Sequence, residues 1–110
     1  MRINKTKQKD VMICNVNGDI DINSSPDIRK TFDDLTKIQE KKIIINLKEV
    51  SYMDSSGLAT LVEVLKKTKN YGGRLRLSNL ADKVKGLFEI TKLEKIFEIY
   101  ETAEDAITNF

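Results

Sequence analysis

Two adjacent hydroxyl side chains, Ser55 and Ser56, lie in the short stretch Asp54-Ser55-Ser56-Gly57. A serine can act as a nucleophile when a neighbouring base activates it, or it can accept a phosphoryl group from a kinase. A run with helical spacing follows directly, so Asp54 or a serine can also serve simply as a helix cap. Gly57 falls in the first turn of that helix, where glycine costs about 0.5–1 kcal/mol relative to alanine. This cost predicts that another group approaches the backbone closely at Gly57.

The residue types of the chain exclude most enzymatic uses of this turn. The chain contains no histidine, so a Ser-His-Asp arrangement is impossible. Position 58 is leucine, so the turn lacks the S-x-x-K spacing that pairs a serine with a lysine base. No G-x-x-x-x-G-K-[ST] loop is present to hold nucleotide phosphates, which argues against direct nucleotide binding at the turn. We therefore expect a protein that is not itself an enzyme and that needs no cofactor.

The single cysteine, Cys14, lies within an apolar run that is typical of a strand. One cysteine cannot form an internal disulfide, and zinc requires a cluster of ligands. The lack of histidine also removes the commonest metal ligand. We expect Cys14 to be a small buried hydrophobic residue, and we expect no metal site.

A phosphoacceptor serine agrees better with the physics of this turn. Phosphorylation adds about −1.5 to −2 charges and three strong hydrogen-bond acceptors. At the start of a helix these acceptors meet free N–H groups and the positive end of the helix dipole, so the fold should tolerate the phosphate. The new charge would lie beside Asp54, and near Asp19 and Asp21 if the loop of residues 18–23 runs alongside. An acidic or tightly packed partner surface would be repelled, which predicts a binding switch with little change in fold.

Hydrophobic periodicity predicts a strand–helix–strand unit around the turn. The β-branched run at residues 43–47 is typical of a central strand that is covered on both faces. The helix that follows is expected to end at Gly72-Gly73. Its expected buried face consists of Leu58, Leu61, Val62 and Leu65. Residues 74–77 alternate with a period of two, so this segment is expected to return parallel to the central strand through a right-handed connection.

Further elements are expected on either side of this unit. Residues 2–7, 11–17 and 96–100 are expected strands, and residues 84–88 suggest a short helix. Ser25 is expected to cap another helix, with Pro26 at its first position. The buried stripe of that helix is expected to consist of Ile28, Phe32, Leu35 and Ile38. Thr102 and Asp105 resemble a capping box that opens a last helix, which runs through Ile107.

These elements make an α/β fold with four or five strands and four helices. Ser55 would then lie at the carboxyl end of a central strand, the edge at which open α/β sheets usually bind ligands and partners. The length of 110 residues corresponds to a single domain, residues 1–110.

The charged residues are numerous and balanced, with 19 Lys and Arg against 17 Asp and Glu. The basic residues are spread among acidic ones, and the densest cluster, Lys66, Lys67 and Lys69, falls where a helix dipole favours cations. We therefore expect no direct nucleic-acid binding, because nucleic-acid interfaces concentrate basic residues. No segment approaches the roughly 20 apolar residues of a membrane span, and the N-terminus lacks a signal peptide. A cytoplasmic protein without membrane contact is expected.

Residues 44–58 read Ile-Ile-Asn-Leu-Lys-Glu-Val-Ser-Tyr-Met-Asp-Ser-Ser-Gly-Leu. This stretch resembles the signature of the STAS domain, in its stand-alone anti-sigma factor antagonist form. The upstream Gly18-Asp19-Ile20-Asp21 is similar to the Gly-acid-aliphatic-Asp turn of the family, and Gly72-Gly73 and residues 84–88 also match. The resemblance covers essentially the whole chain. It implies a STAS-like fold with a mixed sheet of four or five strands and about four helices, packed mainly on one side.

The resemblance also implies a partner-switching cycle. The unphosphorylated antagonist binds an anti-sigma factor that is also a serine protein kinase, and this binding frees a sigma factor. The kinase then phosphorylates the antagonist and releases it, and a PP2C-type phosphatase resets it. Ser55 matches the phosphoacceptor of the family, and Asp21 matches an acidic residue of its partner-binding surface. The rest of the expected partner-binding surface consists of Met53, Asp54, Ser56 and Gly57, with Asn23 and Ser24 as rim contacts.

A second hypothesis remains open beside the switch. Some STAS domains keep the fold and serve as scaffolds, transporter tails or lipid-transport subunits. The chain would then be a constitutive interaction subunit of a signalling or transport complex and would never be phosphorylated. The complete Asp-Ser-Ser-Gly stretch favours the switch.

Overall fold

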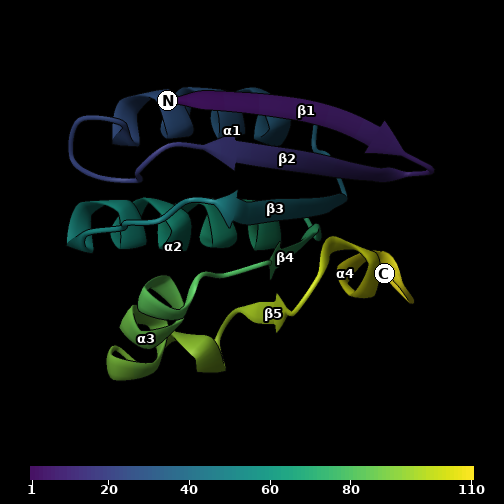
Figure 1. Ribbon diagram of the computed structural model, residues 1–110. Coiled ribbons are helices and arrows are strands. Elements are labelled where there is room, and N and C mark those ends of the chain that lie inside the picture. Colours follow the sequence, from purple (N-terminus) through teal and green to yellow (C-terminus); the bar gives the residue numbers. More distant parts are fainter.

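The computed structural model describes residues 1–110, and its centre is a five-stranded sheet in the order β1-β2-β3-β4-β5. β1 (Arg2–Gln8) and β2 (Val11–Asn17) form an antiparallel hairpin. The parallel strands β3 (Lys42–Glu49), β4 (Arg74–Ser78) and β5 (Glu98–Tyr100) follow in order from β2 (Figure 1). The sheet is therefore mixed, with β3 at its centre.

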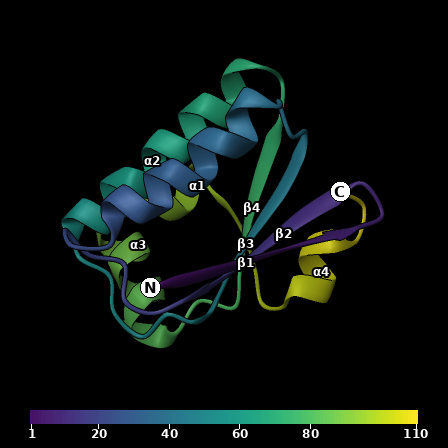
Figure 2. The same cartoon turned by 90° about the horizontal axis from the view of Figure 1, so that it is seen from above.

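The helices cover the two faces of the sheet unequally. α1 (Ser25–Lys37), α2 (Ser55–Asn70) and α3 (Asp82–Ile90) lie on one face, whereas the short α4 (Ala103–Ile107) lies on the other (Figure 2). A 3-10 turn, η1 (Leu93–Lys95), leads from α3 into β5. This architecture confirms the expected α/β fold with helices mainly on one side. No helix combines the length and apolar character that a membrane crossing requires.

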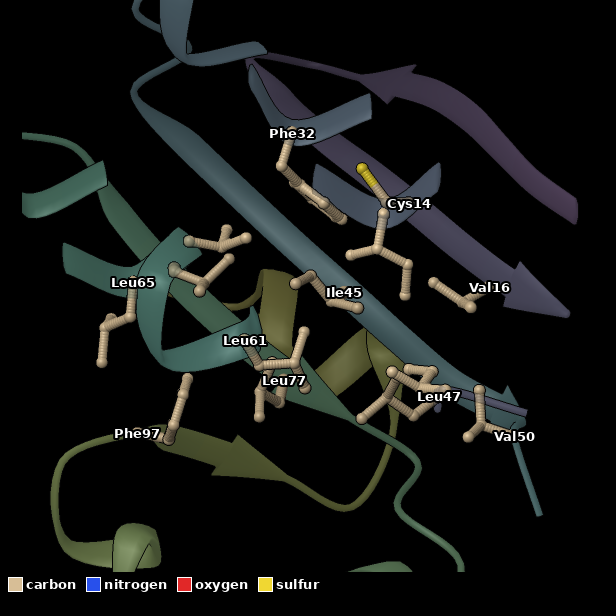
Figure 3. Packing of buried hydrophobic residues seen from close by; sticks show 14 of the residues in the cluster. Cys14, Val16, Phe32, Ile45, Leu47, Val50, Leu61, Leu65, Leu77 and Phe97 are labelled. Atoms are coloured by element: carbon tan, nitrogen blue, oxygen red, sulfur yellow. The ribbon is translucent and has the colours of Figure 1, made fainter. Parts of the chain in front are cut away.

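The apolar run of β3 is buried on both faces, as the sequence predicts for a central strand. Ile43 and Ile45 pack into the main core, a cluster of 20 buried residues beneath α1, α2 and α3. Figure 3 shows Ile45 of β3 among core side chains that include Leu61 of α2 and Phe32 of α1. Ile44 belongs to a smaller cluster on the α4 face, together with Val11, Ile13 and Ala106. Both layers therefore hold in place the strand that leads to the Ser55 turn.

Cys14 is fully buried within the main core. Burial raises the pKa of the Cys14 thiol to about 12, because the apolar surroundings disfavour the thiolate. The expectation of a small, buried hydrophobic residue is confirmed.

Several local predictions are wrong by one residue or one helix face. α1 begins at Ser25 with Ser24 at the cap position, one residue earlier than expected, and the Ser24 side chain makes no capping hydrogen bond. The Ser25 N–H instead donates to the Asp21 carbonyl oxygen at 2.9 Å. Ile38 is 68% exposed, because the helix ends at Lys37 and the chain turns away at Gln39, whose φ is 53°. Val62 is only partly buried, whereas Val64 is buried. One residue turns an α-helix by about 100°, so Val62 lies at the edge of the stripe that Leu61 defines.

Arg76 of β4 carries a charge, yet its side chain is buried. Its guanidinium lies over the rings of Tyr100 and Phe110, at 4.9 and 4.3 Å from their centroids. It also donates hydrogen bonds to the carbonyl oxygens of Ala106 and Thr108, at 2.8 and 3.2 Å. Arg76 thus fastens the C-terminal segment onto the sheet.

The strand expected at residues 96–100 is shorter than predicted and begins at Glu98. Ile96 is not part of it, because the Ile96 N–H closes η1 by donating a hydrogen bond to Leu93 O.

Candidate functional site

Ser55 is the first residue of α2, and Asp54 caps that helix. The Asp54 carboxylate accepts a hydrogen bond from the Gly57 N–H at 2.9 Å, and the Asp54 carbonyl accepts one from the Leu58 N–H at 3.0 Å. The backbone N–H groups of Ser55 and Ser56 have no acceptor within the protein. The Ser55 side chain is exposed, and Ser56 is half-buried. A free hydroxyl therefore lies beside unsatisfied donors at the positive end of a helix.

The loop between β2 and α1 runs alongside this turn, which meets the condition under which Asp19 and Asp21 were expected near Ser55. Ile20 pairs with Met53 in an isolated parallel bridge. The Ile20 N–H donates to Tyr52 O at 3.0 Å, and the Asp54 N–H donates to Ile20 O at 3.2 Å. The second carboxylate oxygen of Asp54 accepts a bond from the Ile22 N–H at 3.3 Å. Asp54 therefore joins the two loops while it caps α2, so they form one surface.

The close packing of the residue 18–23 loop against the start of α2 explains why residue 57 is a glycine. A Cβ atom at Gly57 would lie 2.6 Å from the Ile20 Cγ2 atom and closer still to the Ile20 carbonyl oxygen. The predicted close approach to the backbone is confirmed, and the approaching group is Ile20 of the same chain. Any larger residue at Gly57 would push the loop away from the start of α2.

The loop carries its own network of hydrogen bonds. One carboxylate oxygen of Asp21 accepts from the N–H groups of Asn23 and Ser24, at 2.9 and 3.0 Å. The Ser24 hydroxyl donates to Asp19 O at 2.7 Å and accepts from the Asp21 N–H at 2.9 Å. The Ser25 hydroxyl bonds to Asp21 O at 2.7 Å. These bonds hold the loop backbone in one conformation and fix the orientation of the Asp21 carboxylate.

The structure brings all the expected site residues to one edge of the sheet, with different exposures. Ser55 and Asn23 are exposed, while Asp21, Asp54 and Ser56 are half-buried. Three of the expected contact residues, Ser24, Met53 and Gly57, are buried. The buried three can shape the surface but present little area of their own to a partner.

Two apolar side chains at this edge were missed by the sequence reasoning. Ile22 is 68% exposed and Tyr52 is 52% exposed, and they belong to the two loops that Asp54 joins. Exposure of large apolar side chains to water is unfavourable, so a partner that covers them gains binding free energy. Aromatic residues are also enriched in protein interfaces. The available signal was a large apolar residue inside a polar, turn-prone loop.

Three acidic side chains lie on the two loops that meet at the Ser55 turn. Asp54 precedes it directly, and Asp19 and Asp21 come from the neighbouring loop, where Asp19 accepts a bond from the Ser51 hydroxyl at 3.3 Å. Both carboxylate oxygens of Asp54 already accept backbone bonds, and no carboxylate contacts the Ser55 hydroxyl. The exposed Ser55 hydroxyl therefore lies in an acidic surface, and no carboxylate bonds to it as an activating base would.

Comparison with known proteins decides the family, because the STAS domain model matches residues 2–106. The chain belongs to the STAS domain family. This STAS domain is 38% identical over 103 residues to the anti-sigma-B factor antagonist of Bacillus subtilis (strain 168). The aligned residues make up 94% of this chain and 93% of the relative. The chain is 30% identical over 104 residues to the protein of the same name from Staphylococcus aureus (strain NCTC 8325 / PS 47), covering 94% and 96%.

The fold of this STAS domain also matches solved structures. A crystal structure described as an anti-sigma factor antagonist from Thermotoga maritima superposes with a TM-score of 0.90 at 28% identity, covering 96% of this chain and 91% of that one. The family resemblance and the expected fold are thereby confirmed, while the roles of the individual site residues remain predictions.

Proposed function

We propose that this STAS domain is an anti-sigma factor antagonist whose binding to an anti-sigma factor is switched off by phosphorylation of Ser55. In the unphosphorylated state, the surface around Ser55 binds an anti-sigma factor that is also a serine protein kinase, and a sigma factor is released. Relatives that align over nearly the whole chain are named anti-sigma-B factor antagonists, which supports the proposal.

The observation that carries the proposal is the position of Ser55. Its exposed hydroxyl lies at the first position of α2, next to two N–H groups without acceptors, in a surface that Asp54 holds together. The free N–H groups and the helix dipole can stabilise a phosphate there, so phosphorylation need not disturb the fold. The phosphate would add negative charge beside Asp19, Asp21 and Asp54. A partner surface that fits the neutral hydroxyl would be repelled by this charge and would have to remove water from it, so the complex would dissociate.

The phosphoryl transfer itself requires groups from the partner. The γ-phosphoryl group of ATP would move to the Ser55 oxygen, ADP would leave, and the hydroxyl proton would pass to a base. Both Asp54 oxygens are engaged by backbone N–H groups, so we assign this base to the kinase. A PP2C-type phosphatase would return the hydroxyl by hydrolysis and release inorganic phosphate.

The first test uses a purified complex with the kinase-type anti-sigma factor of the same organism. We expect MgATP to release the parent protein with one phosphoryl group on Ser55, because the new charge opposes rebinding. The variant Ser55→Ala should bind as well as the parent and should stay bound after MgATP is added. Gel filtration reports the complex, and phosphopeptide mapping locates the phosphate.

Other outcomes of this test separate the alternatives. Release of phosphorylated Ser55→Ala would assign the acceptor to another residue, Ser56 first. A parent protein that binds stably but never acquires phosphate would contradict the switch and support the constitutive interaction module.

Tyr52 provides a second prediction at the same surface. We expect Tyr52→Ala to weaken binding to the anti-sigma factor about tenfold, because a half-exposed aromatic ring beside Ser55 would be covered in the complex. The matched control is Ile90→Ala, since Ile90 is 83% exposed on α3 and lies outside this surface. Isothermal titration calorimetry measures both affinities. Equal affinities of the two variants would remove Tyr52 from the interface.

A further inference from the structure

The C-terminal strap, as we call residues 103–110, lies on the face of the sheet opposite α1, α2 and α3 (Figure 2). It consists of the short helix α4 and the residues that follow it, and it covers the small apolar cluster on β2 and β3. Ala106 is the only buried residue of the strap, while Ile107 and Phe110 are partly buried. Because the one fully buried side chain is a single methyl group, apolar contacts alone hold the strap weakly.

Arg76 of β4 donates every side-chain hydrogen bond between the sheet and the strap. Its Nη1 atom bonds to Ala106 O at 2.8 Å and to Thr108 O at 3.2 Å, and its Nη2 atom bonds to Asn109 O at 3.3 Å. The same guanidinium lies 4.3 Å from the centroid of the Phe110 ring. Charged donors form the stronger hydrogen bonds of proteins. A single side chain therefore provides most of the polar attachment of the strap.

The backbone hydrogen bonds of the strap are local. The N–H groups of Ala106, Thr108 and Phe110 donate to carbonyl oxygens of residues 102–107, at 3.1, 3.3 and 3.2 Å. A helix as short as α4 is not stable in water by itself, so it depends on its contacts with the sheet. Attachment of the strap and formation of its helix are therefore coupled, and these three amides report both.

Detachment of the strap would leave no buried charge without a partner. The Arg76 Nε atom bonds to Glu98 Oε1 at 3.2 Å, and the guanidinium lies 4.9 Å from the centroid of the Tyr100 ring. Glu98 and Tyr100 belong to β5, so both contacts persist when the strap leaves. The main core of 20 buried residues lies beneath α1, α2 and α3 and keeps its packing. We therefore expect detachment to require less free energy than unfolding of the domain.

We propose that the C-terminal strap opens and closes as one unit on the folded domain, and that Arg76 is the residue that holds it closed. In the open state α4 is unfolded, and the apolar cluster of Val11, Ile13 and Ile44 on the second face of the sheet is uncovered. Segments with few apolar contacts commonly open in this way as cooperative units. The strap does not include the surface around Ser55, so the proposal can be tested without any protein partner.

The test follows amide hydrogen exchange of the full chain by two-dimensional NMR at increasing urea concentrations. We expect the amides of Ala106, Thr108 and Phe110 to share one opening free energy. This free energy should be lower than that of the β3 amides and should depend less on urea, because opening exposes less surface than unfolding. Protection that decreases stepwise toward Phe110 would indicate fraying of the chain end and would overturn the proposal. An opening free energy equal to that of β3 would overturn it as well.

A core variant separates opening of the strap from unfolding of the domain. Ile45→Val removes one buried methylene group from the main core, on the face of β3 that packs against the helices. We expect exchange of the β3 amides to become about fivefold faster, while exchange of the strap amides stays unchanged. Equal acceleration of both sets would show that the strap opens only when the whole domain unfolds, which would overturn the proposal.

Variants of Arg76 test its role directly. Arg76→Met removes the donors but keeps a flexible apolar side chain, and we expect exchange of the strap amides to become about 20-fold faster. Arg76→Lys keeps the charge without the planar fork, so a smaller acceleration is expected, and it serves if Arg76→Met perturbs the fold. The matched control is Arg74→Lys, because Arg74 lies on the same strand and pairs with the same Glu98 but bonds to no carbonyl of the strap. Strap exchange that is no faster in the Arg76 variants than in this control would overturn the proposal.

Discussion

Replacing Ser55 by aspartate is expected to weaken binding to the anti-sigma factor by at least about 100-fold, while the fold stays intact. The new carboxylate would add to the negative charge of Asp19, Asp21 and Asp54 on one surface. The partner would have to desolvate this carboxylate at a position where it otherwise contacts a neutral hydroxyl. Within the protein, the same charge lies at the first position of α2, where an anion is favoured by the helix dipole. Ser55→Asp should therefore weaken binding to the partner while leaving the stability of the fold unchanged or slightly higher.

Calorimetric titration measures the affinity of Ser55→Asp, and circular dichroism measures its helicity and melting temperature. Asn4→Asp is the matched control, because Asn4 is exposed on the edge strand β1 and the substitution changes the net charge equally. The control should bind like the parent. If Ser55→Asp also binds like the parent, charge at Ser55 does not control the complex; if it melts at much lower temperature, unfolding rather than repulsion explains any lost binding.

Gly57→Ala is expected to lower the free energy of unfolding by about 3 kcal/mol. The added methyl carbon would lie 2.6 Å from the Ile20 side chain and closer still to the Ile20 carbonyl oxygen. A backbone carbonyl cannot rotate away as a side chain can, so the loop must move. That movement would strain the Ile20–Met53 bridge and the bond between Ile22 and Asp54. The loss is a large fraction of the stability of a domain of this size.

Gly86→Ala is the control for this prediction. Gly86 also lies within a helix, α3, but apart from its own helix backbone and chain neighbours no atom lies within 4 Å of the position of its added Cβ. Alanine there should raise the free energy of unfolding by about 0.5–1 kcal/mol, because it restricts the unfolded chain and favours the helix. Urea denaturation measures both variants. A stabilised Gly57→Ala would show that the loop can retreat freely and that Gly57 does not fix the crossing.

The stretch from β3 through α2 was the part of the fold most open to prediction. A buried β-branched run, a capping aspartate and an apolar stripe with helical spacing are local signals, each complete within a few residues. They place Ser55 at the start of a helix and at the carboxyl end of a central strand, where the structure has it. The boundaries that failed, at Ile38 and Ser25, depend on how the chain leaves or enters a helix.

The amino-acid sequence by itself thus determined the strand–turn–helix around Ser55, the lack of a histidine base and the resemblance to STAS domains. Only the tertiary structure decided that Ile20 explains Gly57, that Ser24 and Met53 are buried, and that Ile22 and Tyr52 are exposed beside Ser55. It also decided that Arg76 is buried under the C-terminal segment. The physical reason is that caps and periodicity act between near neighbours, whereas burial at a loop crossing or between a strand and a distant helix depends on segments that meet only after the chain has folded.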